Sequence, residues 1–160
     1  MTDTQKTEAP KSEALKTAVT LPEIAESLRQ AGYRASIAVQ NGKPVIQSAA
    51  QGLGFVVTPG NAIGGDPIRF ADYSYSCLIR IDGELRANLI EQWNQTKRFA
   101  RLYRQQDLLV LSLDVLTIGG VTDRYLVTQC ELWDRLIHDF IAHLRNAQKI
   151  ATPAPTAAAA

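Results

Sequence analysis

The sequence contains few of the side chains that usually carry out chemistry. Its 160 residues include two cysteines and two histidines, which do not combine at a metal-binding spacing. A structural zinc site requires four such ligands close together, so the sequence predicts no metal and no other cofactor. We expect Cys77 and Cys130 to be buried thiols that pack as small apolar groups. The lack of a cysteine framework and of a recognisable signal peptide favours a cytoplasmic protein.

An excess of charge of one sign and long apolar runs are also missing. Lysine and arginine number 17 against 16 acidic residues, which gives a net charge of +1. This balance creates no overall field that would attract nucleic acid. No apolar stretch approaches the roughly 20 residues that span a bilayer. We therefore expect neither nucleic acid nor a membrane as a partner.

The two ends of the sequence are poor in large apolar residues. Residues 1–19 mix lysines with acidic residues, and residues 151–160 contain only alanine, proline and threonine. Neither end has enough apolar surface to offset the entropy lost on ordering it. We predict flexible tails over 1–19 and 151–160 and one domain over 20–150. A chain trimmed to this domain is expected to melt within a few degrees of the full-length protein.

Between the ends, the apolar pattern changes several times between the helical and the strand period. Asn41-Gly42 is a strong hairpin signal, because both central residues of such a turn need a positive φ. Helices are predicted over 21–31, 84–97 and 123–149, and strands over 33–40, 44–50, 53–58, 74–81, 99–105 and 108–116. Short turns imply an antiparallel sheet, so we predict an α+β fold with helices packed on the sheet, in the order α-β-β-β-β-α-β-β-α.

Glycine and proline are concentrated in residues 59–73. The glycines lack a phosphate-binding spacing and no helix follows directly, so a connecting loop is predicted. The alternative is a small-ligand-binding domain or a small enzyme that uses this loop with Asp66, Arg69 and Asp72. Catalysis needs an acid, base or nucleophile held by a partner group. The sequence shows no such constellation, so we predict no catalytic residue and no enzyme.

A more specific signal is the segment WNQTKRFAR, from Trp93 to Arg101. LSLDV follows at 111–115 and GGVT at 119–122, while AGY at 31–33 and PVI at 44–46 precede it. In this order and spacing, these segments resemble the YbjN family, bacterial proteins described as sensory-transduction regulators. The likeness runs from about Leu21 to Leu144. It departs at 59–73, which is longer and richer in glycine than the family pattern.

The resemblance implies a fold like that of the type III secretion chaperones. These are small α+β proteins that commonly dimerise and bind extended peptide segments of a partner. No enzymatic activity is implied. Trp93 and Phe99 are expected in the core, and Asn94 is expected to satisfy backbone groups near its helix end. We predict a chaperone-like or regulatory module that binds a protein or peptide partner, with a homodimer as a further prediction.

The candidate partner-binding residues are Arg98, Arg101, Tyr103 and Arg104. Arg101 and Tyr103 share one face of the predicted strand and Arg104 lies on the other, so they suggest a polar rim rather than one flat patch. Strand charges that meet only solvent are the alternative interpretation. A continuous basic stripe through the three arginines would instead indicate nucleic-acid binding.

Overall fold

The computed structural model describes residues 13–150, which contain three helices and eight strands. The helices are α1 (Leu21–Gln30), α2 (Leu89–Thr96) and α3 (Asp123–Ile150). The strands are β1 (Ser36–Gln40), β2 (Lys43–Ala50), β3 (Leu53–Pro59), β4 (Ala62–Ile63), β5 (Asp66–Phe70), β6 (Asp72–Arg80), β7 (Arg101–Gln105) and β8 (Leu108–Leu116). Apart from the short β4–β5 pair, this is the predicted α+β order.

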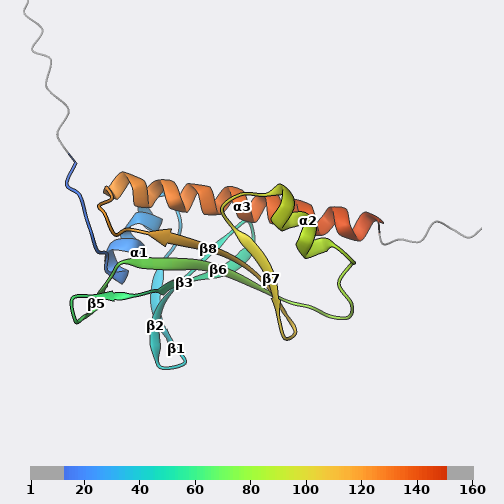
Figure 1. The fold of residues 1–160 in the computed structure, drawn as a ribbon, viewed down its shortest axis with the longest axis horizontal. Helices are drawn as coiled ribbons and strands as arrows, with labels where there is room; N and C mark the ends of the chain where they lie inside the picture. Colours follow the sequence, from blue (N-terminus) through green and yellow to red (C-terminus); the bar gives the residue numbers. More distant parts are fainter. Residues whose placement is uncertain (1–12, 151–160) are drawn as a thin grey trace, which may run out of the picture.

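Six strands form one antiparallel sheet in the order β1-β2-β3-β6-β8-β7, so β1 and β7 are its edges. All three helices lie on one face of this sheet (Figure 1). Helix α3 runs along the sheet, with α1 and α2 near its opposite ends (Figure 1). The β8 strand lies between β6 and β7, as its long apolar run predicts.

Tight turns with positive φ connect the first three strands. The φ values are 49° and 75° at Asn41 and Gly42, and 54° and 81° at Gln51 and Gly52. Positive φ at both central residues is typical of type I′ turns, whose twist matches that of the flanking strands. The first turn confirms the Asn-Gly prediction.

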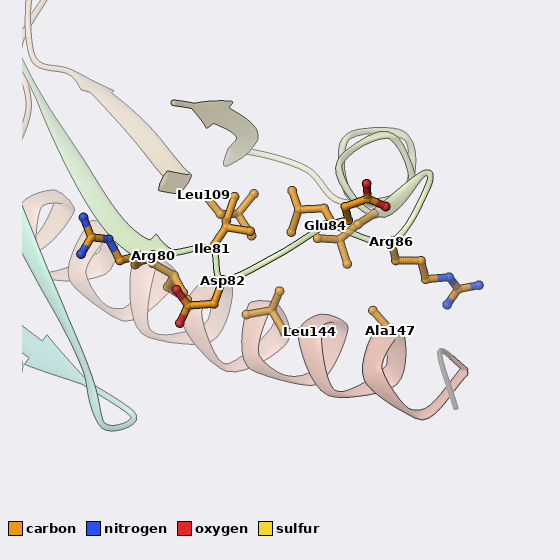
Figure 2. A pocket seen from close by; sticks show the side chains of 11 residues that line it. Arg80, Ile81, Asp82, Glu84, Arg86, Leu109, Leu144 and Ala147 are labelled. Carbon is orange, nitrogen blue, oxygen red and sulfur yellow. The ribbon is translucent and has the colours of Figure 1, made fainter. Parts of the chain in front are cut away.

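The second helix is shorter than predicted. The sequence predicts a start at Glu84, but α2 begins at Leu89, and its N-cap Asn88 has a φ of 69°. Gly83 has a φ of 91°, and Asp-Gly favours a turn, which here takes the place of the first helical turns. The residues between these two points form a loop that crosses the C-terminal part of α3 (Figure 2).

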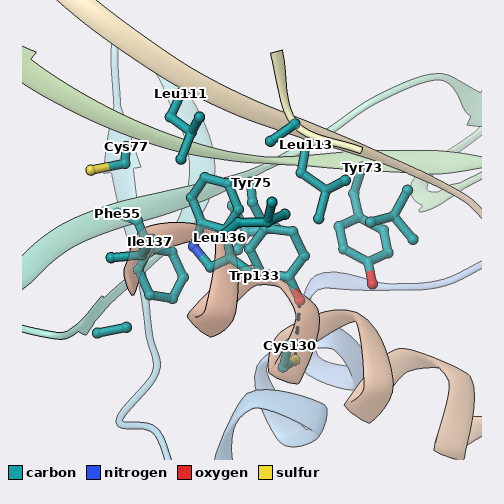
Figure 3. Close-up of a cluster of buried hydrophobic side chains, with 14 of the residues drawn as sticks. Phe55, Tyr73, Tyr75, Cys77, Leu111, Leu113, Cys130, Trp133, Leu136 and Ile137 are labelled. Atoms are coloured by element: carbon teal, nitrogen blue, oxygen red, sulfur yellow. Dashed lines mark hydrogen bonds between the residues drawn. The ribbon is translucent and has the colours of Figure 1, made fainter. Parts of the chain in front are cut away.

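The core lies between the covered face of the sheet and the helices. Tyr75 of β6 stacks on Trp133 of α3 with ring centroids 5.4 Å apart, and Phe55 of β3 meets Trp133 edge-on at 5.9 Å (Figure 3). Apolar residues spaced by threes and fours along the sequence form the buried face of α3, and those at its centre are at most 1% exposed: Leu126, Cys130, Trp133, Ile137 and Phe140.

The residues just before α1 belong to the core, so the prediction of a flexible tail through Val19 is wrong for them. Val19 is fully buried and exchanges backbone hydrogen bonds of 2.9 Å with Phe70. Lys16 exchanges backbone hydrogen bonds with Val121 at 2.7 and 2.9 Å. The folded unit therefore begins before position 20. The predicted tail over 151–160 and residues 1–12 lie outside the described residues.

Candidate functional site

The β7 edge of the sheet is closed by a side chain of α2. Asn94 donates from Nδ2 to the Leu102 carbonyl at 2.8 Å, and its Oδ1 accepts from the Leu102 N–H at 2.9 Å. The amide therefore satisfies both outward-facing backbone groups in the middle of β7, as a neighbouring strand would. Asn94 does bind backbone groups as predicted, but these belong to the strand rather than to the helix end.

Replacing Asn94 with aspartate should lower the free energy of unfolding by about 1–3 kcal/mol, because a carboxylate cannot donate to the Leu102 carbonyl. Urea denaturation followed by tryptophan fluorescence would measure this loss. The same amide-to-acid change at exposed Gln92, on the same helix, is the matched control. It should cost less than about 0.5 kcal/mol. Equal losses in the two variants would contradict the proposed role of the Asn94 amide.

A strained turn connects α2 to β7. The N–H of Ala100 donates to the carbonyl of Arg98 at 3.0 Å, and Phe99 between them has a φ of 75°. This is a γ-turn whose central residue has a positive φ, a backbone conformation that residues other than glycine rarely adopt. The Phe99 side chain is 62% exposed, so the prediction that it lies in the core is wrong. Trp93 fills the core here instead, and its Nε1 donates to the Ala100 carbonyl at 3.0 Å.

The four predicted partner-binding residues lie on different surfaces around this turn. The Arg98 guanidinium lies 4.9 Å from the Phe99 ring centroid. Arg101 donates to Asp114 at 2.8 Å, and its guanidinium lies 5.9 Å from the ring centroid of Tyr103. Because the intervening Leu102 is buried, Arg101 and Tyr103 lie on the uncovered face of the sheet.

Arg104 lies on the other side of β7, where its Nε donates to the backbone carbonyl of Gln106 at 2.9 Å. The three arginines Arg98, Arg101 and Arg104 therefore do not form a continuous basic stripe. The sequence correctly predicts that Arg101 and Tyr103 share a face and that Arg104 does not. It gives no sign that Asn94 closes this edge.

At the opposite edge, no strand within residues 13–150 pairs with the outer side of β1. Gln40 and Lys43 close the two-residue turn, and Ala38 and Ser36 follow at alternate positions of the ladder with β2. Hydrogen-bonded and non-bonded pairs alternate in an antiparallel ladder, so the N–H and C=O groups of Ile37 and Val39 face outward from the sheet. The strand SIAVQ has no charged residue and no proline, the features that commonly protect an edge from pairing.

An apolar hollow of about 300 Å³ lies beside this edge. Side chains of α1, β1, β2 and β5 line it together with the α1 cap: Thr20, Leu21, Pro22, Ile37, Pro44, Pro67, Ile68 and Phe70. Ile37 and Val39 lie on the same face of β1 and are 47% and 73% exposed. The edge therefore combines free backbone groups with an apolar surface.

A second hollow, of about 280 Å³, lies under the loop before α2 (Figure 2). Its floor is apolar, while the charged side chains of Arg80, Glu84 and Arg86 point away from it (Figure 2). Arg80 is paired with Asp107 at 3.0 Å. The hollow could accept an apolar side chain, but it presents no group positioned for catalysis.

The described residues show little chemistry of other kinds. In residues 13–150 no group of three or more potential metal ligands is present, and no helix there is both long and apolar enough to cross a membrane. Burial raises the pKa of the Cys77 thiol to about 11, so this thiol stays protonated at neutral pH.

The 59–73 segment, the alternative candidate site, uses its polar groups for its own structure. Asp72 accepts from Asn61 Nδ2 at 2.7 Å, and Asp66 accepts from the N–H of Ile68 at 3.0 Å. A Cβ at Gly60 would displace the Asp72 carboxylate and lie 2.9 Å from the Asp72 backbone carbonyl oxygen, so glycine is favoured there. The structure brings no catalytic constellation together in this segment.

Comparison with known proteins assigns the chain to a family. The family model YbjN, described as "Putative bacterial sensory transduction regulator", matches residues 20–146. The chain belongs to the YbjN family. No curated protein and no solved structure matches it, so the likeness to type III secretion chaperones stays a prediction. The residues matched by the YbjN model include Asn94 and the turn at Phe99. The description of the family concerns regulation rather than catalysis.

Proposed function

We propose that this YbjN protein is a non-enzymatic regulatory module that binds an extended segment of a protein or peptide partner along the β1 edge. The contrast between the two sheet edges supports this proposal. Asn94 satisfies the middle of β7, whereas the backbone groups of Ile37 and Val39 face outward. A strand added to such an edge gains main-chain hydrogen bonds, and neighbouring pockets select its side chains.

The hollow beside β1 indicates the chemistry of the partner segment. Paired strands place opposite residues on the same face, so alternate side chains of the added strand would lie next to Ile37 and Val39 and over the hollow. We expect these alternate residues to be apolar, since no charged side chain of β1 could pair with a charged partner residue. The free, buried Cys77 and Cys130 suit a reducing compartment, so we place this activity in the cytoplasm.

Replacing Val39 with proline should weaken partner binding by roughly five- to a hundredfold, because a partner carbonyl would lose its donor. The ladder with β2 should persist, since the Val39 N–H faces away from it and proline is tolerated at sheet edges. Val39→Thr keeps the N–H and the branched side chain, and is the matched control. Tagged chains would be cross-linked in extract of the native host, and captured proteins quantified by mass spectrometry.

Supporting evidence is a protein captured equally by the parent chain and Val39→Thr but depleted with Val39→Pro, with thermal melting unchanged. Equal capture by all three chains would contradict the β1 site. The homodimer is a separate proposal, checked by light scattering against the monomer mass of 17.6 kDa. If Val39→Pro only converts a dimer to a monomer, β1 is the contact between copies and the partner site is wrong.

A further inference from the structure

We propose a second docking site, at the turn after α2, for a protein segment that carries a carboxylate beside an apolar side chain. The site, which we call the Phe99 corner, comprises Arg98, Phe99, Leu132 and Arg135. These residues line a hollow of about 240 Å³ between the turn and α3, together with Lys97, Leu136 and Asp139. The corner is at the β7 end of the sheet, opposite to β1, and its evidence is independent of the β1 proposal.

The first argument is the backbone strain at Phe99. Its φ of 75° is unfavourable for any side chain larger than hydrogen, and its ring is 62% exposed. Core packing therefore does not compensate the strain, and glycine would make the same turn more easily. Strained residues cluster at binding and catalytic sites. An exposed aromatic ring held in this conformation is explained by contact with a partner.

The second argument is that the corner is rigidly held. Trp93 is fully buried and donates to the Ala100 carbonyl, directly after Phe99. Asn94 fixes Leu102 through two hydrogen bonds. These contacts hold the chain after Phe99, and before it the N–H of Lys97 donates to the Trp93 carbonyl at 2.8 Å, so the backbone that carries the ring is fixed before a partner arrives. Preorganisation of this kind reduces the entropy lost on binding.

The third argument is the charge around the hollow. Its lining includes three cations and one carboxylate, which leaves a net charge of +2. Lys97 pairs with Asp139 at 3.2 Å. Neither Arg98 nor Arg135 has an acidic partner within salt-bridge distance among residues 13–150. Arg98 and Arg135 thus offer two guanidinium groups at a hollow with an exposed ring, which suits a carboxylate next to an apolar side chain.

A protein segment fits this corner better than nucleic acid or an anionic membrane does. Those larger polyanions require an extended basic surface. Here Arg101 is already bound to Asp114 at 2.8 Å, and Arg104 lies on the other side of β7. Arg98 and Arg135 therefore belong to one small hollow rather than to a basic stripe along β7, and Leu132 and Leu136 contribute apolar side chains to its lining.

The test uses the full chain and the capped peptide acetyl-Gly-Glu-Leu-Glu-Gly-amide at millimolar concentration. Amide NMR shifts should change at Phe99, Leu132 and Arg135, with an affinity at least fivefold weaker for the matched peptide in which glutamine replaces both glutamates. Arg98→Gln and Arg135→Gln should each weaken binding severalfold. Phe99→Gly should abolish binding while the melting temperature stays the same or rises, because glycine relieves the positive φ. Val39→Pro should leave this binding unchanged.

Three results would overturn the proposal. The first is that the amide NMR signals of the Phe99 corner do not change when the peptide is added. The second is that a peptide with lysine at both glutamate positions binds as tightly as the original peptide. The third is that the Phe99→Gly variant binds the original peptide as tightly as the parent chain does. Tighter binding of single-stranded DNA or of phosphatidylserine vesicles through the same residues would assign the corner to another class of partner. If Val39→Pro does not affect partner capture but the peptide binds at the Phe99 corner, the protein is a protein-binding module whose site is the Phe99 corner.

Discussion

Replacing Trp133 with alanine should lower the free energy of unfolding by about 3–5 kcal/mol, the usual cost of truncating a buried aromatic side chain. Trp133 is 1% exposed and lies at the centre of the aromatic cluster between α3 and the sheet (Figure 3). It stacks on Tyr75 and meets Phe55 edge-on, so the variant loses contacts with two strands and leaves a cavity. Urea denaturation followed by circular dichroism would measure the change.

The phenylalanine variant at the same position separates packing from hydrogen bonding. The indole Nε1 of Trp133 is buried without a hydrogen-bond partner among the described residues. Trp133→Phe removes this unsatisfied group and keeps an aromatic ring, so we expect a loss of only about 1–2 kcal/mol. Nearly unchanged denaturation midpoints in both variants would show that this face of α3 is exposed, for example as a surface between copies.

The sequence predicts the elements whose signals are local. The Thr20 and Glu23 pair forms the capping box of α1, with the Thr20 N–H donating to the Glu23 carboxylate at 2.8 Å. Asn41-Gly42 forms the expected turn, and the threefold and fourfold apolar spacing of α3 identifies its buried face. The start of α2 is predicted wrongly because Leu85 continues a helical pattern, while the left-handed Gly83 and Asn88 exclude helix.

The candidate site was less predictable, because its main features depend on contacts between distant segments. The sequence alone does not show that Asn94 reaches Leu102, or which of the six strands lie at the edges. The family motif does contain Trp93, Asn94 and Phe99, which build the turn and the closed β7 edge. The sequence predicts a core position for Phe99 because aromatic residues are usually buried, whereas in the structure Phe99 lies in a turn with a φ of 75° and its ring is exposed.

Chains that begin at residue 13 and at residue 20 should differ in the free energy of unfolding by about 2–4 kcal/mol. The shorter chain loses the buried surface of Ala18 and Val19 and the backbone hydrogen bonds to Phe70 and Val121. Part of this loss is offset, because the shorter chain no longer has to order the segment. The melting temperature should fall by roughly 4–16 °C. The sequence-based prediction, a difference of a few degrees at most, would hold only if these contacts contribute little.

A pair of point variants tests the same contacts without shortening the chain. Val19→Ala should cost about 1.5–3 kcal/mol, because Val19 is fully buried against the core. Val39→Ala makes the same change at a side chain that is 73% exposed, and should cost less than about 0.5 kcal/mol apart from a small loss of strand propensity. Hydrogen bonds to Asp123 and Glu23 raise the pKa of Lys16, so this segment is also held by charge. Equal costs for the two valines would show that the segment before α1 does not pack, and that the folded unit begins at Thr20.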